Sequence, residues 1–241
     1  MNNRSIFTMA FLFLAFSMKV AGEAIHELIG HGIFVLLFGG EVVTVHISLL
    51  WPYELSFIEW SGSFAGWQQA WVDGGGILVS LVVSFACQTL LLLKIVKNRF
   101  LSASLLWLSF WTFLSPAGYL IIGAIRPFGD VVALISEGVL TQGTSLLIGI
   151  GIFLLSFFST TPILANLLSS VDLVRDVKGL RIALSLFWLI VPTVTAINCL
   201  GRGQPLVYLL TFTTMSFLPV LAVHIILPLL LKNLKTGRYD S

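Results

Sequence analysis

The chain has 241 residues, of which 57% are hydrophobic and 10% are charged, and its mean hydropathy is +1.01. A soluble domain carries about 25% charged residues, so this composition excludes a soluble globular enzyme, and its apolar character excludes a disordered chain. The net charge of +2 is too small to indicate nucleic-acid binding, and we expect a protein embedded in a lipid bilayer.

Six apolar runs are long enough to cross a bilayer, since a helical span needs about 20 apolar residues. They cover 5–38, 74–95, 100–124, 144–168, 182–200 and 204–231. The sequence therefore predicts an all-α membrane protein with about six transmembrane helices, located in the cell membrane. We divide this integral membrane domain into a first part, 1–140, and three further helices in 141–241.

The connection after the first span has the pattern of a β-strand. Apolar and polar residues alternate through 42–50, after two glycines and before Trp51 and Pro52. A period of two predicts a short strand at the membrane surface, with 54–59 as a candidate partner in a hairpin. His46 lies on the polar side of this strand, and we expect it to be solvated.

Basic residues are distributed unevenly between the two membrane faces. The face that carries the N-terminus receives ten of them: Arg4, Lys94, Lys97, Arg99, Arg175, Lys178, Arg181, Lys232, Lys235 and Arg238. The other face receives Arg126 and Arg202. The positive-inside rule then predicts that both termini lie in the cytosol.

The first span contains five ionisable residues, an unusual number for a membrane helix: Lys19, Glu23, His26, Glu27 and His31. An ionisable group at the bilayer centre costs on the order of 2.5–3.5 kcal/mol on insertion scales, so such groups are functional candidates. At about 100° per residue, the five lie within roughly 140° of the helix circumference. They form a polar stripe that we expect to face the interior of the bundle.

Residues 26–31 of this stripe read HELIGH. Two histidines on one helical face, with a glutamate beside the first, are the arrangement by which many zinc proteases hold their metal and a general base. The common motif spaces the histidines by four residues, but here the spacing is five, which rotates about 140° in a regular α-helix. A π-bulge absorbs one extra residue, and Gly30 is a permissive place for it. The spacing therefore predicts a local distortion of the helix.

HELIGH closely resembles the HELLGH motif of the dipeptidyl peptidase III family, in which both histidines bind zinc and the glutamate acts as base. That family is large and soluble, so the resemblance is limited to these six residues.

The order of parts along the chain resembles the site-2 proteases, which are intramembrane zinc metalloproteases. In that family a zinc motif, a β segment at the membrane surface, a small-residue motif and an Asp-Gly motif follow one another. Over about 5–140, this chain has HELIGH at 26–31, the strand at 42–50, Asp-Gly-Gly-Gly at 73–76 and Arg-Pro-Phe-Gly-Asp at 126–130. Two features depart from the family pattern: the zinc motif is one residue longer, and Gly-Asp replaces Asp-Gly.

This resemblance implies that His26 and His31 bind Zn²⁺ and that Glu27 is the general base. It also implies that Asp130 is the third ligand. The topology agrees, because the first and third spans end at the same membrane face, where His31 and Asp130 can meet. Pro127 breaks the helix there, and irregular backbone at membrane depth is tolerated where it lines protein or a watery cavity.

Asp73 and Glu23 are the alternatives for the third ligand. Asp73 begins a span on the same face, although an N-cap role at the start of a close-packed helix is the preferred interpretation. Glu23 lies one turn before Glu27, where it would either bind the metal or orient His26. For Asp130 the competing interpretation is an ion pair with Arg126. For the histidines it is a hydrogen-bonded cluster that joins helices.

The expected function is zinc-dependent hydrolysis of a peptide bond in or near the membrane, with a transmembrane protein as substrate. The unwound substrate would pair with the edge of strand 42–50. A metal-binding membrane protein without protease activity, such as a transporter or an inactive relative, is the alternative. A zinc hydrolase acting on a lipid or a modified terminus is a third hypothesis.

Overall fold

The computed structural model describes residues 3–49, 55–126, 129–171, 173–174, 176–201 and 205–225. Some sequence predictions lie outside these residues. These are the predictions made for residues 51–54, Pro127, Arg175, Arg202 and 226–241, none of which the structure describes.

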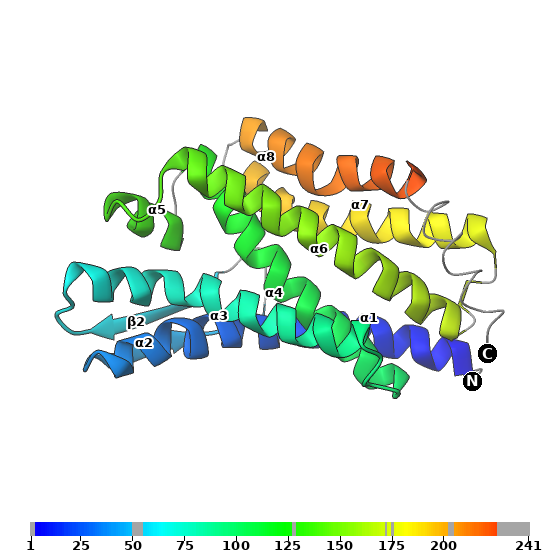
Figure 1. The fold of residues 1–241 in the computed structure, drawn as a ribbon, viewed down its shortest axis with the longest axis horizontal. Helices are drawn as coiled ribbons and strands as arrows, with labels where there is room; N and C mark the ends of the chain where they lie inside the picture. The colour runs from blue at the N-terminus through cyan, green and yellow to red at the C-terminus, as the bar shows by residue number, and fades with distance from the viewer. Residues whose placement is uncertain are drawn as a thin grey trace. The chain divides into compact units, whose positions relative to one another are not determined.

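The polypeptide begins with one long helical rod in three segments, α1 (Asn3–Ala24), the π-helix η1 (Ile25–His31) and α2 (Gly32–Leu37) (Figure 1). A β-hairpin of β1 (Glu41–His46) and β2 (Phe57–Ser61) follows and lies beside α2 and η1. The remaining elements are α3 (Gly66–Leu92), α4 (Arg99–Ile125), α5 (Gly129–Ser136), α6 (Gln142–Ser170), α7 (Val177–Gly201), α8 (Pro205–Phe212) and the π-helix η2 (Thr213–Phe217).

The predicted fold class is confirmed. Within the part of the chain that the structure describes, six helices are long and apolar enough to cross a membrane. They are Ser5–Leu37, Gly66–Leu92, Arg99–Ile125, Gln142–Ser170, Val177–Val194 and Pro205–Ile225.

The second span begins eight residues earlier than the predicted start at 74, because α3 begins at Gly66. Its N-cap is Ala65, whose N–H donates to the side chain of Gln68 at 2.8 Å. Asp73 therefore lies inside α3, and the prediction that it caps this helix is wrong. The hydropathy pattern finds the apolar part of a helix and misses a polar first turn, here one that contains Gln68 and Gln69.

The chain divides into two compact units, Met1–Ser156 and Phe157–Ser241, whose boundary falls inside α6. In the first unit α4 packs against both α1 and α3. Buried polar side chains join these helices: the Ser84 hydroxyl donates to the Ser109 carbonyl at 2.8 Å and lies 2.6 Å from the Thr112 hydroxyl. The indole N–H of Trp111 donates to the carbonyl of Ala15 at 2.8 Å.

The π-helix η1 crosses α3 at backbone contact. A Cβ added to Gly30 would lie 2.5 Å from the Cα of Gly76. A Cβ added to Gly75 would lie 2.4 Å from the Gly30 carbonyl oxygen and 2.5 Å from the ring of Phe34. Real Cβ atoms do not approach other atoms so closely, so only glycine permits this crossing.

The strand predicted at 42–50 is present as β1, which ends at His46, and it pairs in an antiparallel hairpin; residue 50 lies outside the described residues. The partner strand is β2, which begins later than the predicted 54–59. A bulge between Val42 and Thr44 shifts the pairing, so strict alternation does not continue along β1. His46, expected to be solvated, is half-buried and stacks on Phe57 with 5.3 Å between ring centroids.

The second unit contains the second half of α6 together with α7, α8 and η2. Its core centres on Trp188, which is fully buried against Phe157 and donates its indole N–H to the Thr161 hydroxyl at 3.1 Å. The hydroxyl groups of Thr193 and Ser216 form a second polar contact, between α7 and η2, at 3.0 Å.

We expect Gly30→Ala to destabilise the first unit by about 1–3 kcal/mol, because its methyl group would force η1 and α3 apart. Thermal unfolding of the purified protein in detergent would measure the loss. Gly118→Ala is the matched control, since a Cβ at this buried glycine of α4 meets no atom within 4 Å. An unfolding midpoint equal to that of the wild type would contradict the tight crossing.

Candidate metal centre

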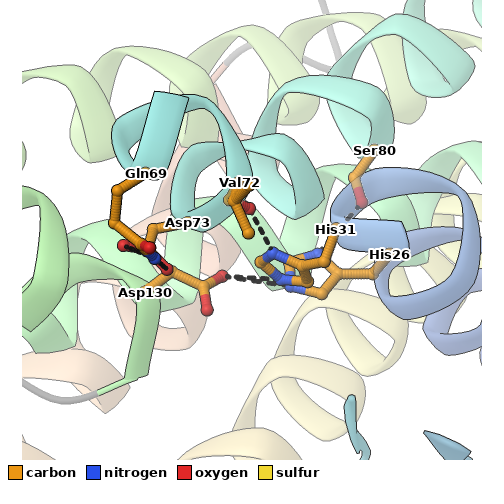
Figure 2. Close-up of polar contacts among 7 residues, drawn as sticks. All are labelled: His26, His31, Gln69, Val72, Asp73, Ser80 and Asp130. Carbon is orange, nitrogen blue, oxygen red and sulfur yellow. Dashed lines mark hydrogen bonds and ion pairs between the residues drawn. The ribbon is translucent and has the colours of Figure 1, made fainter. Parts of the chain in front are cut away.

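The structure brings His26, His31 and Asp130 together in a group that could hold a metal ion. One ligand atom from each residue lies within 4.8 Å of the other two. The Nε2 atoms of His26 and His31 lie 3.1 Å and 3.5 Å from Oδ2 of Asp130 (Figure 2). Both histidines are buried, and the Asp130 side chain is 18% exposed.

The π-helix places the two histidines on one side despite their five-residue spacing. Their ring centroids are 5.0 Å apart, and the rings are nearly perpendicular at 78°. A regular α-helix would rotate His31 about 140° away from His26, whereas a π-helical turn needs more residues and brings them together. The distortion predicted from the spacing is therefore present, and η1 contains the complete HELIGH segment.

Hydrogen bonds from the far side of each ring prepare the Nε2 atoms as ligands. Nδ1 of His31 lies 2.7 Å from the carbonyl oxygen of Val72, which can only accept, so this nitrogen carries the proton. In the neutral form of the ring the lone pair is then on Nε2, the nitrogen that faces Asp130 and that would bind a metal ion. Nδ1 of His26 lies 3.3 Å from the hydroxyl of Ser80, which is able to accept the proton of this nitrogen in the same way (Figure 2).

The space beside the two imidazoles exists because residue 76 has no side chain. A Cβ added to Gly76 would lie 2.5 Å from Nε2 of His26 and 2.5 Å from Nε2 of His31. The glycines of α3 therefore have two roles. They allow the close helix crossing, and they leave the ligand nitrogens unobstructed.

Asp130 enters the site from the first turn of α5. The residue before it, Gly129, has a φ of +54° in the left-handed region, and a Cβ added there would lie 3.2 Å from the ring of Tyr119. Burial disfavours the charged carboxylate, but the hydrogen bonds and charges of the two histidines outweigh it and hold the pKa of Asp130 below its ordinary value. The carboxylate is thus an anionic partner for the histidines, and the competing ion pair with Arg126 is not the contact that the structure contains.

Glu27 is buried beside this group without being part of it. Its side chain is in η1 next to His26, and it interacts electrostatically with both histidines and with Asp130. A carboxylate near a metal but outside its ligand set is the position of a general base.

The two alternative third ligands have other partners. Glu23 forms an ion pair with Lys19 one turn earlier in α1. Both carboxylate oxygens of Asp73 accept from the side-chain amide of Gln69 at 3.0 Å. Neither residue joins the group of His26, His31 and Asp130 in the described part of the chain.

Two aromatic rings that the sequence analysis did not single out cover the histidines. Tyr119 of α4 stacks on His26 with 5.6 Å between centroids, and Trp60 of β2 stacks on His31 at 6.1 Å. Ser80 was also missed, although a signal existed: Ser80, Ser84 and Gln88 are polar residues four apart in an apolar helix, and all are buried. The hairpin therefore contributes a wall of the candidate site.

No protein-family model, curated protein or solved structure matches the chain.

We expect Gly76→Ala to abolish metal binding, because its methyl group would occupy the space between the ligand nitrogens. Metal content of the purified protein after incubation with zinc, measured by mass spectrometry, would show the loss. Gly74→Ala is the matched control in the same glycine run, since its Cβ would meet Leu134 at an ordinary 3.6 Å. Full metal occupancy in Gly76→Ala would exclude the proposed ligand geometry.

We expect Ser80→Ala to weaken metal affinity by about 10- to 100-fold, the usual effect of removing a group that orients a ligating histidine. Competition with a chelator would give the affinity. Ser104→Ala provides a control, because this hydroxyl donates to the Phe100 carbonyl of its own helix. Equal affinities for Ser80→Ala and the wild type would show that Ser80 does not orient His26.

Proposed function

We propose that this protein is a zinc-dependent intramembrane metalloprotease, with His26, His31 and Asp130 as ligands and Glu27 as the general base. One observation carries the proposal. The π-helix η1 directs both histidines of HELIGH at Asp130 and leaves the intervening Glu27 beside the ligand group.

The donor set favours zinc. Two neutral imidazoles and one carboxylate form a common set of protein ligands in catalytic zinc sites, which keep a fourth position open. Tetrahedral zinc with bonds of about 2.0–2.1 Å separates its ligand atoms by about 3.3–3.4 Å. The distances of 3.1 Å and 3.5 Å from Oδ2 of Asp130 to the two Nε2 atoms are close to that separation.

The chemistry of the reaction follows from the placement of the carboxylate of Glu27. A zinc ion held by His26, His31 and Asp130 would supply Lewis acidity, which polarises carbonyl groups and lowers the pKa of a water molecule to about 7. Glu27 accepts a proton from the attacking water and delivers it to the departing amine, so one residue serves both proton transfers. Tyr119 and Trp60 stack on His26 and His31, and both histidines are buried.

A peptide that lies in or near the membrane is the substrate class that fits this location. Two ligands belong to a membrane-spanning helix, and the hairpin that contributes Trp60 lies directly beside them. Strands β1 and β2 provide backbone edges to which an unwound, extended segment of a transmembrane substrate would pair.

The Glu27→Gln variant tests the function. We expect zinc content to stay at the wild-type level, because Glu27 is not a ligand, and cleavage to fall by about 10²- to 10⁴-fold, the usual contribution of a general base. Cleavage would be followed with a quenched fluorescent transmembrane peptide library in proteoliposomes.

Two further variants make this experiment decisive. His26→Ala should lose zinc and cleavage together, whereas Glu41→Gln, at an exposed position of β1, should lose neither. Zinc binding by a wild-type protein that cleaves no peptide would favour a metal-binding membrane protein without protease activity. A wild-type protein without metal would exclude both functions.

A further inference from the structure

The first span contains a buried ion pair that the proposed reaction does not use. The ammonium group of Lys19 donates to the carboxylate of Glu23, one turn further along α1, and the two side chains are 10% and 13% exposed. Both residues lie near the middle of the span Ser5–Leu37. Ionisable groups at such a depth are costly to bury and are functional candidates.

Glu23 occupies a position from which a helix can supply a metal ligand. It precedes His26 by three residues, and in helical carboxylate proteins a Glu-x-x-His sequence binds one metal ion through both side chains. Residues three apart on a helix have Cβ atoms about 5–6 Å apart. This spacing makes Glu23 a latent ligand of any metal ion that His26 holds.

In the structure the carboxylate of Glu23 has a different partner. It contacts Lys19 on the preceding turn, and Glu23 is not part of the group that could hold a metal ion. Helical side chains lean toward the N-terminus of their helix, which favours this contact. A fourth protein ligand would close the site, because catalytic zinc sites combine three protein ligands with one open position. The ion pair therefore preserves the donor set of a catalytic site.

Packing against α4 holds the backbone of α1 around Lys19. Trp111 of α4 donates its indole N–H to the carbonyl of Ala15, one turn before Lys19. A Cβ added to Gly22 would lie 3.5 Å from the side chain of Thr112 and 3.6 Å from that of Trp111, so α1 lies against α4 here as well. The ion pair thus forms on a segment that packing holds in place.

The charges of the site are consistent with a cation at position 19. Glu27 and Asp130, when ionised, carry two negative charges, which balance a divalent metal ion between neutral histidines. Glu23 adds a further negative charge, and a buried charge without a partner is strongly destabilising. Lys19 supplies the balancing charge. Without Lys19, binding the metal ion would give Glu23 a cationic partner again.

We propose that Lys19 holds Glu23 away from the metal and thereby keeps the fourth coordination position open, which makes Lys19 a positioning residue. This inference rests on the proposed function, because the open position matters only at a metal site that performs hydrolysis.

Substitution of Co²⁺ for zinc tests whether the fourth position is open. The visible absorption of protein-bound Co²⁺ depends on its ligands, so added imidazole changes the spectrum wherever it can occupy an open position. We expect this change in the full-length wild type in detergent and in Lys19→Arg, which retains the cation. Lys19→Met should bind Co²⁺ but show no response, because Glu23 occupies the position. A response of Lys19→Met equal to that of the wild type would overturn the proposal.

Lys19→Met also removes a positive charge, and a double variant separates this effect from ligation. Lys19→Met/Glu23→Gln replaces the ion pair with two neutral side chains and keeps the net charge of the wild type. We expect the imidazole response to return. Zinc affinity, measured by competition with a chelator, should be about tenfold higher in Lys19→Met and return to the wild-type value in the double variant, an effect of the size known for groups around a metal site. A double variant that still fails to respond to imidazole would contradict ligation by Glu23.

A further variant decides the question if Lys19→Met does not fold, since that substitution leaves a buried carboxylate without its cation. Lys19→Met/Glu23→His places a neutral ligand at position 23 and adds no buried charge. We expect it to bind Co²⁺ without responding to imidazole. A response equal to that of the wild type would show that position 23 does not reach the metal, and the proposal would be wrong.

Cleavage assays on the same proteins separate this inference from the proposed function. A wild type that cleaves no peptide, with the expected imidazole responses in every variant, would contradict the protease and leave the role of Lys19 standing. Cleavage by the wild type together with an imidazole response in Lys19→Met would do the reverse. A wild type that binds neither Co²⁺ nor zinc would overturn both.

Discussion

The backbone contact between η1 and α3 is the constraint on which the candidate site depends. Gly30, Gly75 and Gly76 carry no Cβ where the two helices cross, so one backbone approaches the other to contact distance. In a bilayer, helices gain little from burying apolar surface against each other, and close packing with hydrogen bonds must supply the association. The same approach brings the Val72 carbonyl and the Ser80 hydroxyl to the histidines. Packing and site chemistry therefore share one set of small residues.

The distorted helix explains how a five-residue histidine spacing is compatible with a shared site. A π-helical turn is less stable than an α-helical one and persists where surrounding contacts select it. Here those contacts are the hydrogen bonds of the two histidines with Ser80 and Val72 of α3. Asp130, which both histidines contact, adds a further contact from α5. Trp60 and Tyr119 stack on the imidazole faces and restrict the rings further. The geometry of the ligand atoms is thus set by groups from η1, β2, α3, α4 and α5.

Much of the fold could be predicted from the sequence, because crossing a bilayer imposes a length and an apolar composition on each helix. The helix ends were less predictable. Helix α3 begins at Gly66, because its backbone hydrogen bonds extend through a polar first turn that has no apolar signal in the sequence. Helix α5 was not predicted, because eight residues between two spans carry too little pattern. The half-buried environment of His46 was not predicted, since it depends on stacking against Phe57 of the partner strand.

Three features follow from the amino-acid sequence alone: the membrane class, the polar stripe of the first span, and the need for a helix distortion between His26 and His31. These are local properties, since they depend on composition, periodicity and the rotation per residue. The choice among Asp130, Asp73 and Glu23 as the carboxylate beside the histidines required the folded structure. The packing of α5 against α3 brings Asp130 within 3.1 Å and 3.5 Å of the two imidazoles. Asp73 instead contacts Gln69, and Glu23 contacts Lys19. Such distances arise between residues about 100 positions apart, where no sequence spacing encodes them.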